Sequence, residues 1–361
     1  MEYATAEGRN VGIDLGKRTY EIKFIGKDGK VTGTNGKTDK SGREKLYAML
    51  RPGDRVALEV CSLGMLMAKE MKEKVGCNVV LLNPSQIALI YRSLKKNDKE
   101  DALKIARLVQ KYTDEELPTV ELPTEHEERI RQILCELRQL KNDRTRDINR
   151  LHDVFLESGI TEIKRKDLAT GSNREDCIKI LKGLALENAR RILKRLSMTD
   201  EQIGEVDELL DRELEGDKNI ERLTEIPGVG KQLSAAFIAF LGDGSRYPNA
   251  SAIGAVTGLV PKLDMSSTKL RLGHITKCGN SNLRSLIILA AWSHVRAKGG
   301  GALKDKFLYM TRVQSKSRKI AIVATARKLA ELMYTLLKTG VPYEKRTSPT
   351  IQQLVGEALT A

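Results

Sequence analysis

The sequence has little of what several common kinds of site require. Its five cysteines are scattered without a C-x-x-C pair, and there are only four histidines, so neither a disulfide framework nor a zinc site is indicated. Aromatic residues make up 4% of the chain, which leaves little for stacking on unpaired bases. The longest apolar runs, such as residues 286–292, are too short to span a bilayer.

The start of the chain is polar and lacks the apolar core of a signal peptide, so we expect a cytoplasmic protein with no membrane partner. The chain does have a large excess of positive charge: 62 Lys and Arg against 48 Asp and Glu give a net charge of +14. So basic a balance favours a polyanionic partner, with nucleic acid the leading candidate. Because histidine and cysteine ligands are scarce, a catalytic metal would need oxygen ligands, which favours Mg²⁺ or Mn²⁺.

The first third of the chain predicts an α/β unit. V-G-I-D-L-G opens it as a short apolar strand that ends in a carboxylate and a glycine. The expected elements are, in order, strands at 11–16, 20–25 and 31–34, a helix at 41–50, a strand at 55–60, a helix at 63–75, a strand at 78–82, and helices after Pro84 and from Asp98 onward. The first three strands form a meander.

Four carboxylates in this unit are candidate metal ligands. Asp14 lies on the first strand, and Glu59 lies in an apolar strand where an unpaired acid is costly to bury. Asp98 and Asp101 are three residues apart at the start of a helix, so they share a face. Three or four such acids can hold two divalent ions that clamp the attacking and leaving oxygens of a phosphodiester.

Three of the four acids also have a simpler interpretation. Asp14 could be a turn residue, and V-G-I-D-L-G also opens actin-like sugar kinases and ATPases, although we find none of their later glycine-rich phosphate loops in a convincing context. Asp98 and Asp101 could be an ordinary solvated helix N-terminus, where the helix dipole favours acids. As an ordered set, the four acids resemble the ribonuclease-H-like (RuvC-like) nuclease core of junction resolvases.

Long charged helices follow from residue 123. An apolar stripe with heptad spacing resumes after an insertion of four residues, which resembles a coiled-coil stutter. Its members are Ile130, Ile133, Leu137, Leu140, Ile148, Leu151 and Phe155. The stripe could be intramolecular core or an oligomer contact, and we favour a helical coiled-coil arm that mediates dimerisation. Residues 175–196 and 199–214 are expected to supply the returning helices.

The P-G-V-G turn at residues 227–230 resembles a helix-hairpin-helix clamp on a DNA backbone. Gly228 and Gly230 would let backbone N–H groups approach a phosphate at a helix N-terminus, and Lys231 would add charge. A plain glycine turn between packed helices is the alternative.

The stretch from residue 262 to 284 contains five Lys and Arg and one acid, with small hydroxyl residues at its centre. This composition predicts a phosphate-binding surface. Its candidate nucleic-acid contacts are Lys269, Arg271, Lys277 and Arg284.

Together with the P-G-V-G turn and the four acids, this stretch resembles the DEDD-type serine transposases of one group of bacterial insertion sequences. That family is related to Piv-type DNA invertases and is known for guidance by a bridge RNA that the element itself makes. The resemblance covers about residues 11–343. It implies that Asp14, Glu59, Asp98 and Asp101 are catalytic metal ligands, and that Ser266 is the nucleophile. Ser267 stands where the family commonly has glycine, which makes it an alternative nucleophile.

The resemblance implies a transposase or recombinase whose partners are donor and target DNA, a guide (bridge) RNA and further copies of itself, as a dimer or tetramer. In our mechanistic hypothesis Ser266 attacks the scissile phosphodiester, forms a phosphoserine link and releases a 3′-hydroxyl, assisted by acid-bound Mg²⁺. One alternative is a RuvC-like metal-dependent, structure-specific nuclease in which Ser266 only contacts phosphate. Another is a non-catalytic nucleic-acid scaffold.

The expected fold class is α/β followed by all-α. The expected domains are a RuvC-like four-carboxylate domain at 1–118, a helical coiled-coil arm at 119–218, a mostly helical transposase domain with the helix-hairpin-helix and the serine at 219–345, and a tail at 346–361.

Overall fold

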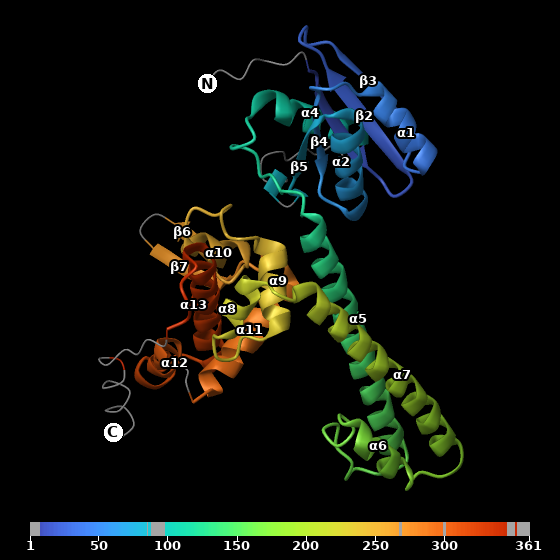
Figure 1. Cartoon of the computed structure of the whole chain (residues 1–361), viewed down its shortest axis with the longest axis vertical. Helices are drawn as coiled ribbons and strands as arrows, with labels where there is room; N and C mark the ends of the chain where they lie inside the picture. Colours follow the sequence, from blue (N-terminus) through green and yellow to red (C-terminus); the bar gives the residue numbers. More distant parts are fainter. Residues whose placement is uncertain are drawn as a thin grey trace. The chain divides into compact units, whose positions relative to one another are not determined.

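The computed structural model divides into two compact units, Met1–Leu122 and Pro123–Ala361 (Figure 1). The structure describes residues 8–84, 86–87, 98–266, 269–298, 301–344 and 351; the side chains of Asp98, Ser172, residues 264–266 and residues 269–272 are outside the description. The expected tail at 346–361 therefore lies almost wholly outside the described residues. Each unit has its own hydrophobic core.

A five-stranded mixed sheet forms the centre of the first unit, with strand order β3-β2-β1-β4-β5. The strands are β1 (Asn10–Leu15), β2 (Thr19–Ile25), β3 (Val31–Lys37), β4 (Arg55–Glu59) and β5 (Asn78–Leu82). β1, β2 and β3 pair antiparallel, whereas β4 and β5 run parallel to β1. The expected three-strand meander is therefore confirmed.

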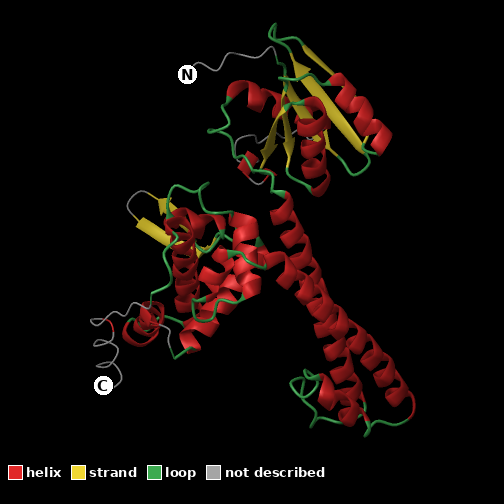
Figure 2. Ribbon diagram, viewed as in Figure 1, coloured by secondary structure: helices red, strands yellow, loops and turns green. Residues whose placement is uncertain are grey.

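Helices cover both faces of this sheet (Figure 2). α1 (Lys40–Met49) and α2 (Ser62–Val75) pack on the face that carries Ile13, Ile22 and Leu58. α4 (Asp98–Lys111) packs on the other face, where its Ile105, Leu108 and Val109 contact Ala57 and Val80. Of the helix expected after Pro84, only residues 84, 86 and 87 are described.

Gly12 lets α4 approach the sheet directly. A β-carbon at Gly12 would lie 2.2 Å from the carbonyl oxygen of Ala102 and 2.3 Å from the backbone nitrogen of Ala106, so no side chain fits between β1 and the helix. Because glycine has only a hydrogen in place of a side chain, α4 can lie this close to β1.

The second unit begins with a helical arm. α5 (Glu125–Glu157) and α7 (Gly183–Leu214) run side by side, and α6 (Gly171–Ile178) lies near their far end (Figure 1). The stripe predicted on α5 is buried against α7 and the elements around it within the same chain. Its partners include Ala189, Ile192, Leu196, Val206, Leu210 and Leu214. The stripe is thus intramolecular core, and its interpretation as an oligomer contact is wrong for these side chains.

The arm returns as one long helix, α7, preceded by the short α6, instead of the two helices expected at 175–196 and 199–214. The helix expected from residue 199 does not start there, because Thr199 and Asp200 lie within α7. The Thr199 hydroxyl donates to the Arg195 carbonyl at 2.9 Å, one turn back. The carboxylate of Asp200 is bound by cations from other segments instead of capping a helix.

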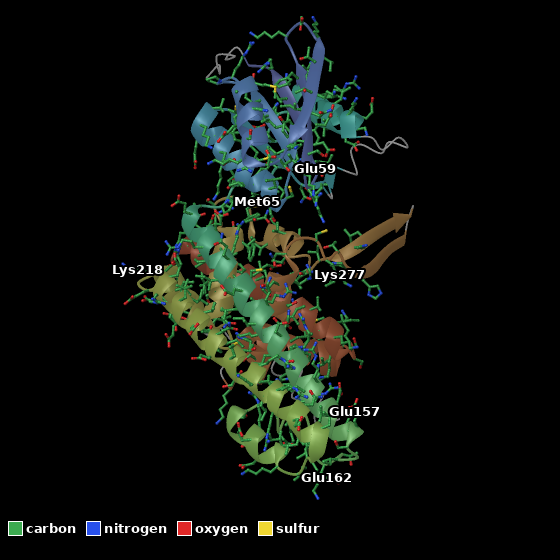
Figure 3. The ribbon with its side chains drawn as sticks, turned by 90° about the vertical axis from the view of Figure 1, so that its right-hand side faces the viewer. Glu59, Met65, Glu157, Glu162, Lys218 and Lys277 are labelled. Atoms are coloured by element: carbon green, nitrogen blue, oxygen red, sulfur yellow. The ribbon has the colours of Figure 1, made fainter. Side chains whose placement is uncertain are left out.

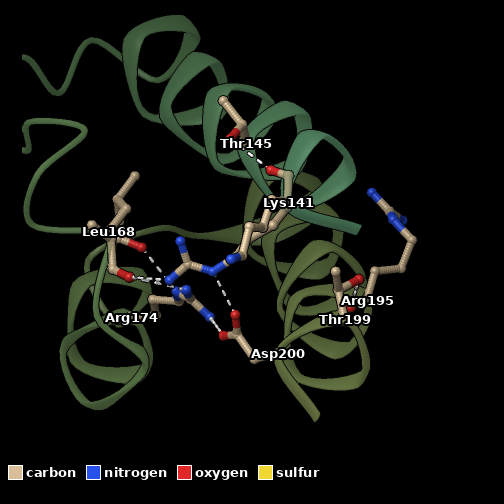
Figure 4. Close-up of polar contacts among 9 residues, drawn as sticks. Lys141, Thr145, Leu168, Arg174, Arg195, Thr199 and Asp200 are labelled. Atoms are coloured by element: carbon tan, nitrogen blue, oxygen red, sulfur yellow. Dashed lines mark hydrogen bonds and ion pairs between the residues drawn. The ribbon is translucent and has the colours of Figure 1, made fainter. Parts of the chain in front are cut away.

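Asp200 joins three segments of the arm (Figure 4). Its two carboxylate oxygens accept from Arg144 of α5 at 2.5 Å and Arg174 of α6 at 2.6 Å. Arg174, whose side chain is 4% exposed, also donates to the Leu168 carbonyl at 2.8 Å. Burial alone would raise the pKa of Asp200, but the hydrogen bonds from the two arginines outweigh it, so the pKa lies below its ordinary value.

The rest of the second unit is a helical domain with one hairpin. Its elements are α8 (Lys218–Thr224), α9 (Lys231–Leu241), α10 (Ala250–Val256), β6 (Pro261–Ser266), β7 (Lys269–Ile275), α11 (Ser281–Arg296), α12 (Gly301–Leu308), a π-helical turn (Tyr309–Val313) and α13 (Arg318–Thr339). Phe237, Ile287 and Leu329 bring α9, α11 and α13 into one core, which also holds the first half of α5. No helix in the described part of the chain is long and apolar enough to cross a membrane.

We expect Gly12→Ala to destabilise the first unit by about 2 kcal/mol or more, because the new methyl group meets the backbone of α4. Hydrogen–deuterium exchange should be faster in α4 and β1. The matched control is Gly204→Ala in α7, where a β-carbon meets nothing within 4 Å. There the higher helix propensity of alanine should stabilise by up to about 1 kcal/mol. Unchanged exchange in Gly12→Ala would contradict the close contact.

We expect Asp200→Asn to loosen the tip of the arm at neutral pH, because Arg174 loses a charged partner while buried. Since Asp200 is about one-third exposed, screening should keep the loss to roughly 1–2 kcal/mol. A carboxylate with a lowered pKa stabilises the fold above its unfolded pKa of about 4 and loses this effect as the pH falls through the folded value. The wild-type arm should therefore lose stability below about pH 4 more steeply than the variant, as followed by exchange of α6 amides.

Candidate functional site

Two of the predicted acids lie on one face of the sheet, as the strand register shows. Gly12 of β1 is paired with Ala57 of the parallel strand β4. Because side chains alternate along a strand, Asp14 and Glu59 lie two residues beyond this pair on the same face. Gly12 contacts α4 and Ala57 packs with it, so this is the face that α4 covers. Asp14 is half-buried, whereas Glu59, the last residue of β4, is exposed (Figure 3). The burial cost expected for Glu59 therefore does not arise.

The other two acids lie in the first turn of α4. Asp98 begins the helix, and its side chain is outside the description. Asp101 directly precedes Ala102, whose carbonyl oxygen faces Gly12. The Asp101 carboxylate accepts a hydrogen bond from Lys104, one turn along α4, at 2.5 Å. The fold thus brings the elements that bear all four acids to one side of the sheet.

These acids do not form a finished metal site in this conformation. Among the described side chains, no three of His, Cys, Asp or Glu lie close enough together to hold a metal ion. Asp14 and Glu59 each have a polar or electrostatic interaction of their own. The donor set nevertheless suits a hard divalent cation, since it consists of carboxylates on one sheet face and a covering helix. Lys104 already binds one carboxylate oxygen of Asp101, so its positive charge would oppose the binding of an ion there.

The sequence reasoning missed a further acid, Glu21. It lies directly opposite Asp14 in the antiparallel pair of β1 and β2, so the two carboxylates share a face. Glu21 is 7% exposed, and Lys23 binds it at 2.9 Å, which offsets the repulsion between the two acids. The alternation in T-Y-E-I-K-F-I could have shown that Glu21 lies on the other face of the strand from Tyr20, Ile22 and Phe24. It could not have shown that Glu21 pairs with Asp14, because that depends on the register of the hairpin.

The predicted nucleophile Ser266 is the last residue of β6 and stands opposite Lys269 in the hairpin register. Ser267 lies outside the described residues, as do the side chains of Ser266, Lys269 and Arg271. The foot of the hairpin is fixed by backbone hydrogen bonds: Thr276 donates to the Val260 carbonyl at 2.9 Å. The structure therefore places the serine at the tip of a two-stranded hairpin in the second unit.

The other predicted phosphate contacts divide into exposed and structural residues. Lys277 follows the hairpin and is exposed (Figure 3). Arg284 of α11 donates to the carbonyl oxygens of Thr257 at 3.3 Å and Cys278 at 2.9 Å. Its guanidinium thus helps to hold the segments before and after the hairpin together.

The P-G-V-G turn connects α8 to α9 as expected, and its two glycines have different roles. Gly228 has φ +87°, and a β-carbon there would lie 2.5 Å from the backbone nitrogen of His294, so close packing against α11 requires this glycine. Gly230, the N-cap of α9, has open space around its α-carbon. Lys231 binds Asp211 of α7 at 2.6 Å, so part of its charge is already balanced.

Comparison with known proteins identifies relatives over nearly the whole chain. The family model for DEDD transposases of IS110 ("Transposase") matches residues 11–159, and the model "Transposase IS116/IS110/IS902 family" matches residues 220–306. Together the two models cover more than half of the chain. They include the sheet acids, α4, the P-G-V-G turn and the serine hairpin.

Three relatives illustrate the range of similar proteins. The transposase for insertion sequence element IS1328 of Yersinia enterocolitica is 26% identical over 344 residues, covering 93% of this chain and 98% of the relative. The transposase for IS1111A of Coxiella burnetii is 26% identical over 342 residues, covering 92% and 90%. The pilin gene-inverting protein of Moraxella bovis is 25% identical over 349 residues, covering 93% and 98%.

If the α4 face binds a divalent ion, Asp101→Asn should weaken Mn²⁺ binding by roughly tenfold, because a ligand loses its charge. Lys104→Gln should strengthen it, because the competing ammonium is gone. Arg107→Gln, which removes an exposed charge farther along α4, is the control and should change little. Calorimetric titration with Mn²⁺ measures all three, and equal affinity in Lys104→Gln and Arg107→Gln would contradict the placement of the ion at Asp101.

Proposed function

Because the chain belongs to the IS110/IS116/IS902 family of transposases, we propose that this DNA transposase cuts and rejoins DNA through a serine nucleophile, with a carboxylate-bound divalent ion assisting. The observation that carries this proposal is the strand register, which puts Asp14 and Glu59 on the face covered by the Asp98–Asp101 turn of α4. The DEDD family match is consistent with dependence on a divalent metal.

The strand order supports a ribonuclease-H-like (RuvC-like) assignment for the acidic unit, since three antiparallel strands are followed by two parallel ones, with acids on the first and fourth. α8, the P-G-V-G turn and α9 support a helix-hairpin-helix, in which the N-terminus of α9 would bind a phosphate. The proposed domains remain 1–118, 119–218, 219–345 and the tail at 346–361.

Asp14, Glu59, Asp98 and Asp101 would hold the ion, which as Mg²⁺ or Mn²⁺ supplies positive charge for the developing phosphate oxyanions. The protein's own step begins at Ser266. Its hydroxyl oxygen attacks the phosphorus and loses its proton, the bond from phosphorus to the 3′-oxygen breaks, and the leaving oxygen gains a proton as the 3′-hydroxyl. One ester bond replaces another, so the phosphoserine link retains the bond energy for rejoining.

The proposed partners are donor DNA, target DNA, a guide (bridge) RNA and further copies of the chain. The net charge of +14 supports polyanionic partners in general. With the α5 stripe buried inside the chain, contacts between copies would use other surfaces.

A second candidate is a RuvC-like metal-dependent nuclease that uses the acids alone. One observation favours it: the acids lie in a compact unit with its own core, separate from the unit that carries Ser266. In that case the serine only contacts phosphate, and no protein–DNA link forms.

We expect Ser266→Ala to abolish a covalent protein–DNA adduct on a nicked suicide substrate, because the attacking oxygen is absent. Glu59→Ala and Asp101→Ala should give the same cleavage defect, at least about a hundredfold, if acids and serine act in one site. Denaturing gels and mass spectrometry of the adduct measure both effects. Ser267→Ala is the matched control and should retain the adduct.

The same experiment separates the alternatives. Cleavage by Ser266→Ala at the wild-type rate, without any adduct in the wild type, would establish the nuclease. Loss of the adduct in Ser267→Ala alone would move the nucleophile to Ser267. Transposition in cells that survives Asp101→Ala and Glu59→Ala would favour a non-catalytic scaffold.

A further inference from the structure

A half-buried group of cations lies between α12 and α13. It consists of Lys306 on α12 and the adjacent Arg327 and Lys328 on α13. Glu331, one turn along α13, binds Lys328 at 2.5 Å and lies 3.4 Å from the Nε atom of Arg327. The charge of Glu331 also acts on Lys306. Asp305, a buried residue of α12, is a second acid and directly precedes Lys306 in the sequence. The three cations outnumber these two acids.

This cation cluster, Lys306, Arg327 and Lys328, adjoins the foot of the serine hairpin. A β-carbon at Gly254 of α10 would lie 3.0 Å from Cγ of Arg327 and 3.3 Å from Cγ1 of Val260, so both side chains pack at the same point. Val260 directly precedes β6, and its carbonyl accepts the hydrogen bond from Thr276 that closes the hairpin. The stem of Arg327 thus packs where the hairpin leaves the helical domain.

Two buried polar atoms at this place make no hydrogen bond in the described part of the chain, namely Nε of Arg327 and Oγ1 of Thr276. Nε of Arg327 still has an ionic partner, because it lies 3.4 Å from the carboxylate of Glu331. The Thr276 hydroxyl at the foot of the hairpin is therefore the group that lacks a partner among the described residues. A phosphate, with several acceptor oxygens, matches the planar donor array of an arginine.

The state of Lys306 agrees with this picture. Burial lowers the pKa of its ammonium group, and the neighbouring charges of Lys328 and Arg327 lower it further. Binding an anion beside the three cations would relieve the repulsion among them.

We propose that Lys306, Arg327 and Lys328 form a binding site for a backbone phosphate of duplex DNA, which holds the substrate strand at the foot of the hairpin that carries Ser266. This inference rests on the proposed function for the identity of the strand. The side chains of Arg327 and Lys328 are 34% and 42% exposed, so the site is open to solvent. An open site favours a nucleic-acid strand over a small anion that would need to be enclosed. A strand can therefore pass over the cations while one phosphate is held between them.

The test is DNA binding by the full-length chain in a Ser266→Ala background, so that binding is measured without cleavage. Fluorescence anisotropy of a labelled duplex is recorded over a series of NaCl concentrations, with an RNA duplex of the same length in parallel. We expect Lys306→Gln combined with Arg327→Gln to weaken DNA binding about tenfold and to reduce the salt slope by about one phosphate contact. Lys218→Gln, an exposed cation of α8 (Figure 3), is the control for loss of charge alone.

Glu331→Gln distinguishes a phosphate site from a structural network. If the cation cluster binds DNA, removal of the negative charge of Glu331 should tighten binding several-fold. If the cluster only stabilises α12 and α13, loss of the acid should weaken binding by loosening the fold. Trp292, the single tryptophan of the chain, contacts Phe307 beside Lys306 with ring centroids 5.8 Å apart. Unchanged tryptophan emission therefore shows that α12 is still packed in each variant.

Three results would overturn the inference: DNA binding by the double variant equal to that of the Lys218→Gln control, weaker binding in Glu331→Gln, or a loss confined to the RNA duplex. Failure of the serine chemistry has a different signature. In that case the wild type forms no adduct, yet its DNA affinity still depends on Lys306 and Arg327.

Discussion

The contact between Gly12 and the backbone of α4 is the constraint on which the acidic unit depends. Because α4 lies against β1 with no side chain between them, the helix cannot shift along the sheet without a clash. The first turn of α4 is thereby held beside the strands that carry Asp14 and Glu59. The helix that carries Asp98 and Asp101 therefore lies on the same face of the sheet as Asp14 and Glu59, which are far from it in the sequence.

Much of this unit follows from its sequence. Short apolar strands and the turn residues between them predict the meander, the order of strands and helices, and the place of Asp14 on the first strand. Local patterns could not show that Glu21 pairs with Asp14, because that depends on the register of a hairpin. They also placed Glu59 inside its strand, whereas it lies at the exposed end. Register and strand ends are set by the whole sheet, which a local pattern does not contain.

In the second unit, the sequence pattern predicted where a helix lies but not what it packs against. The apolar stripe on α5 was correctly located, but periodicity alone cannot say whether the partner helix belongs to the same chain or to another. Likewise the helix start expected at residue 199 is wrong, because Thr199 lies inside α7 and Asp200 binds Arg144 and Arg174. The cation cluster could not be predicted from the sequence for a similar reason. Its residues come from two helices, and they lie close together only because α12 packs on α13.

The packing of α5 limits which insertions and deletions this helix can accept. The first half of the α5 stripe packs in the core of the helical domain, and the second half packs in the core of the arm tip. Leu137 and Ile148 are eleven residues apart, and at about 100° per residue that step returns to nearly the same side of the helix. One inserted residue would turn the tip by about 100° and expose one of the two cores. Insertions or deletions of about seven or eleven residues in α5 would keep both halves of the stripe on the same side of the helix, so that both cores stay packed.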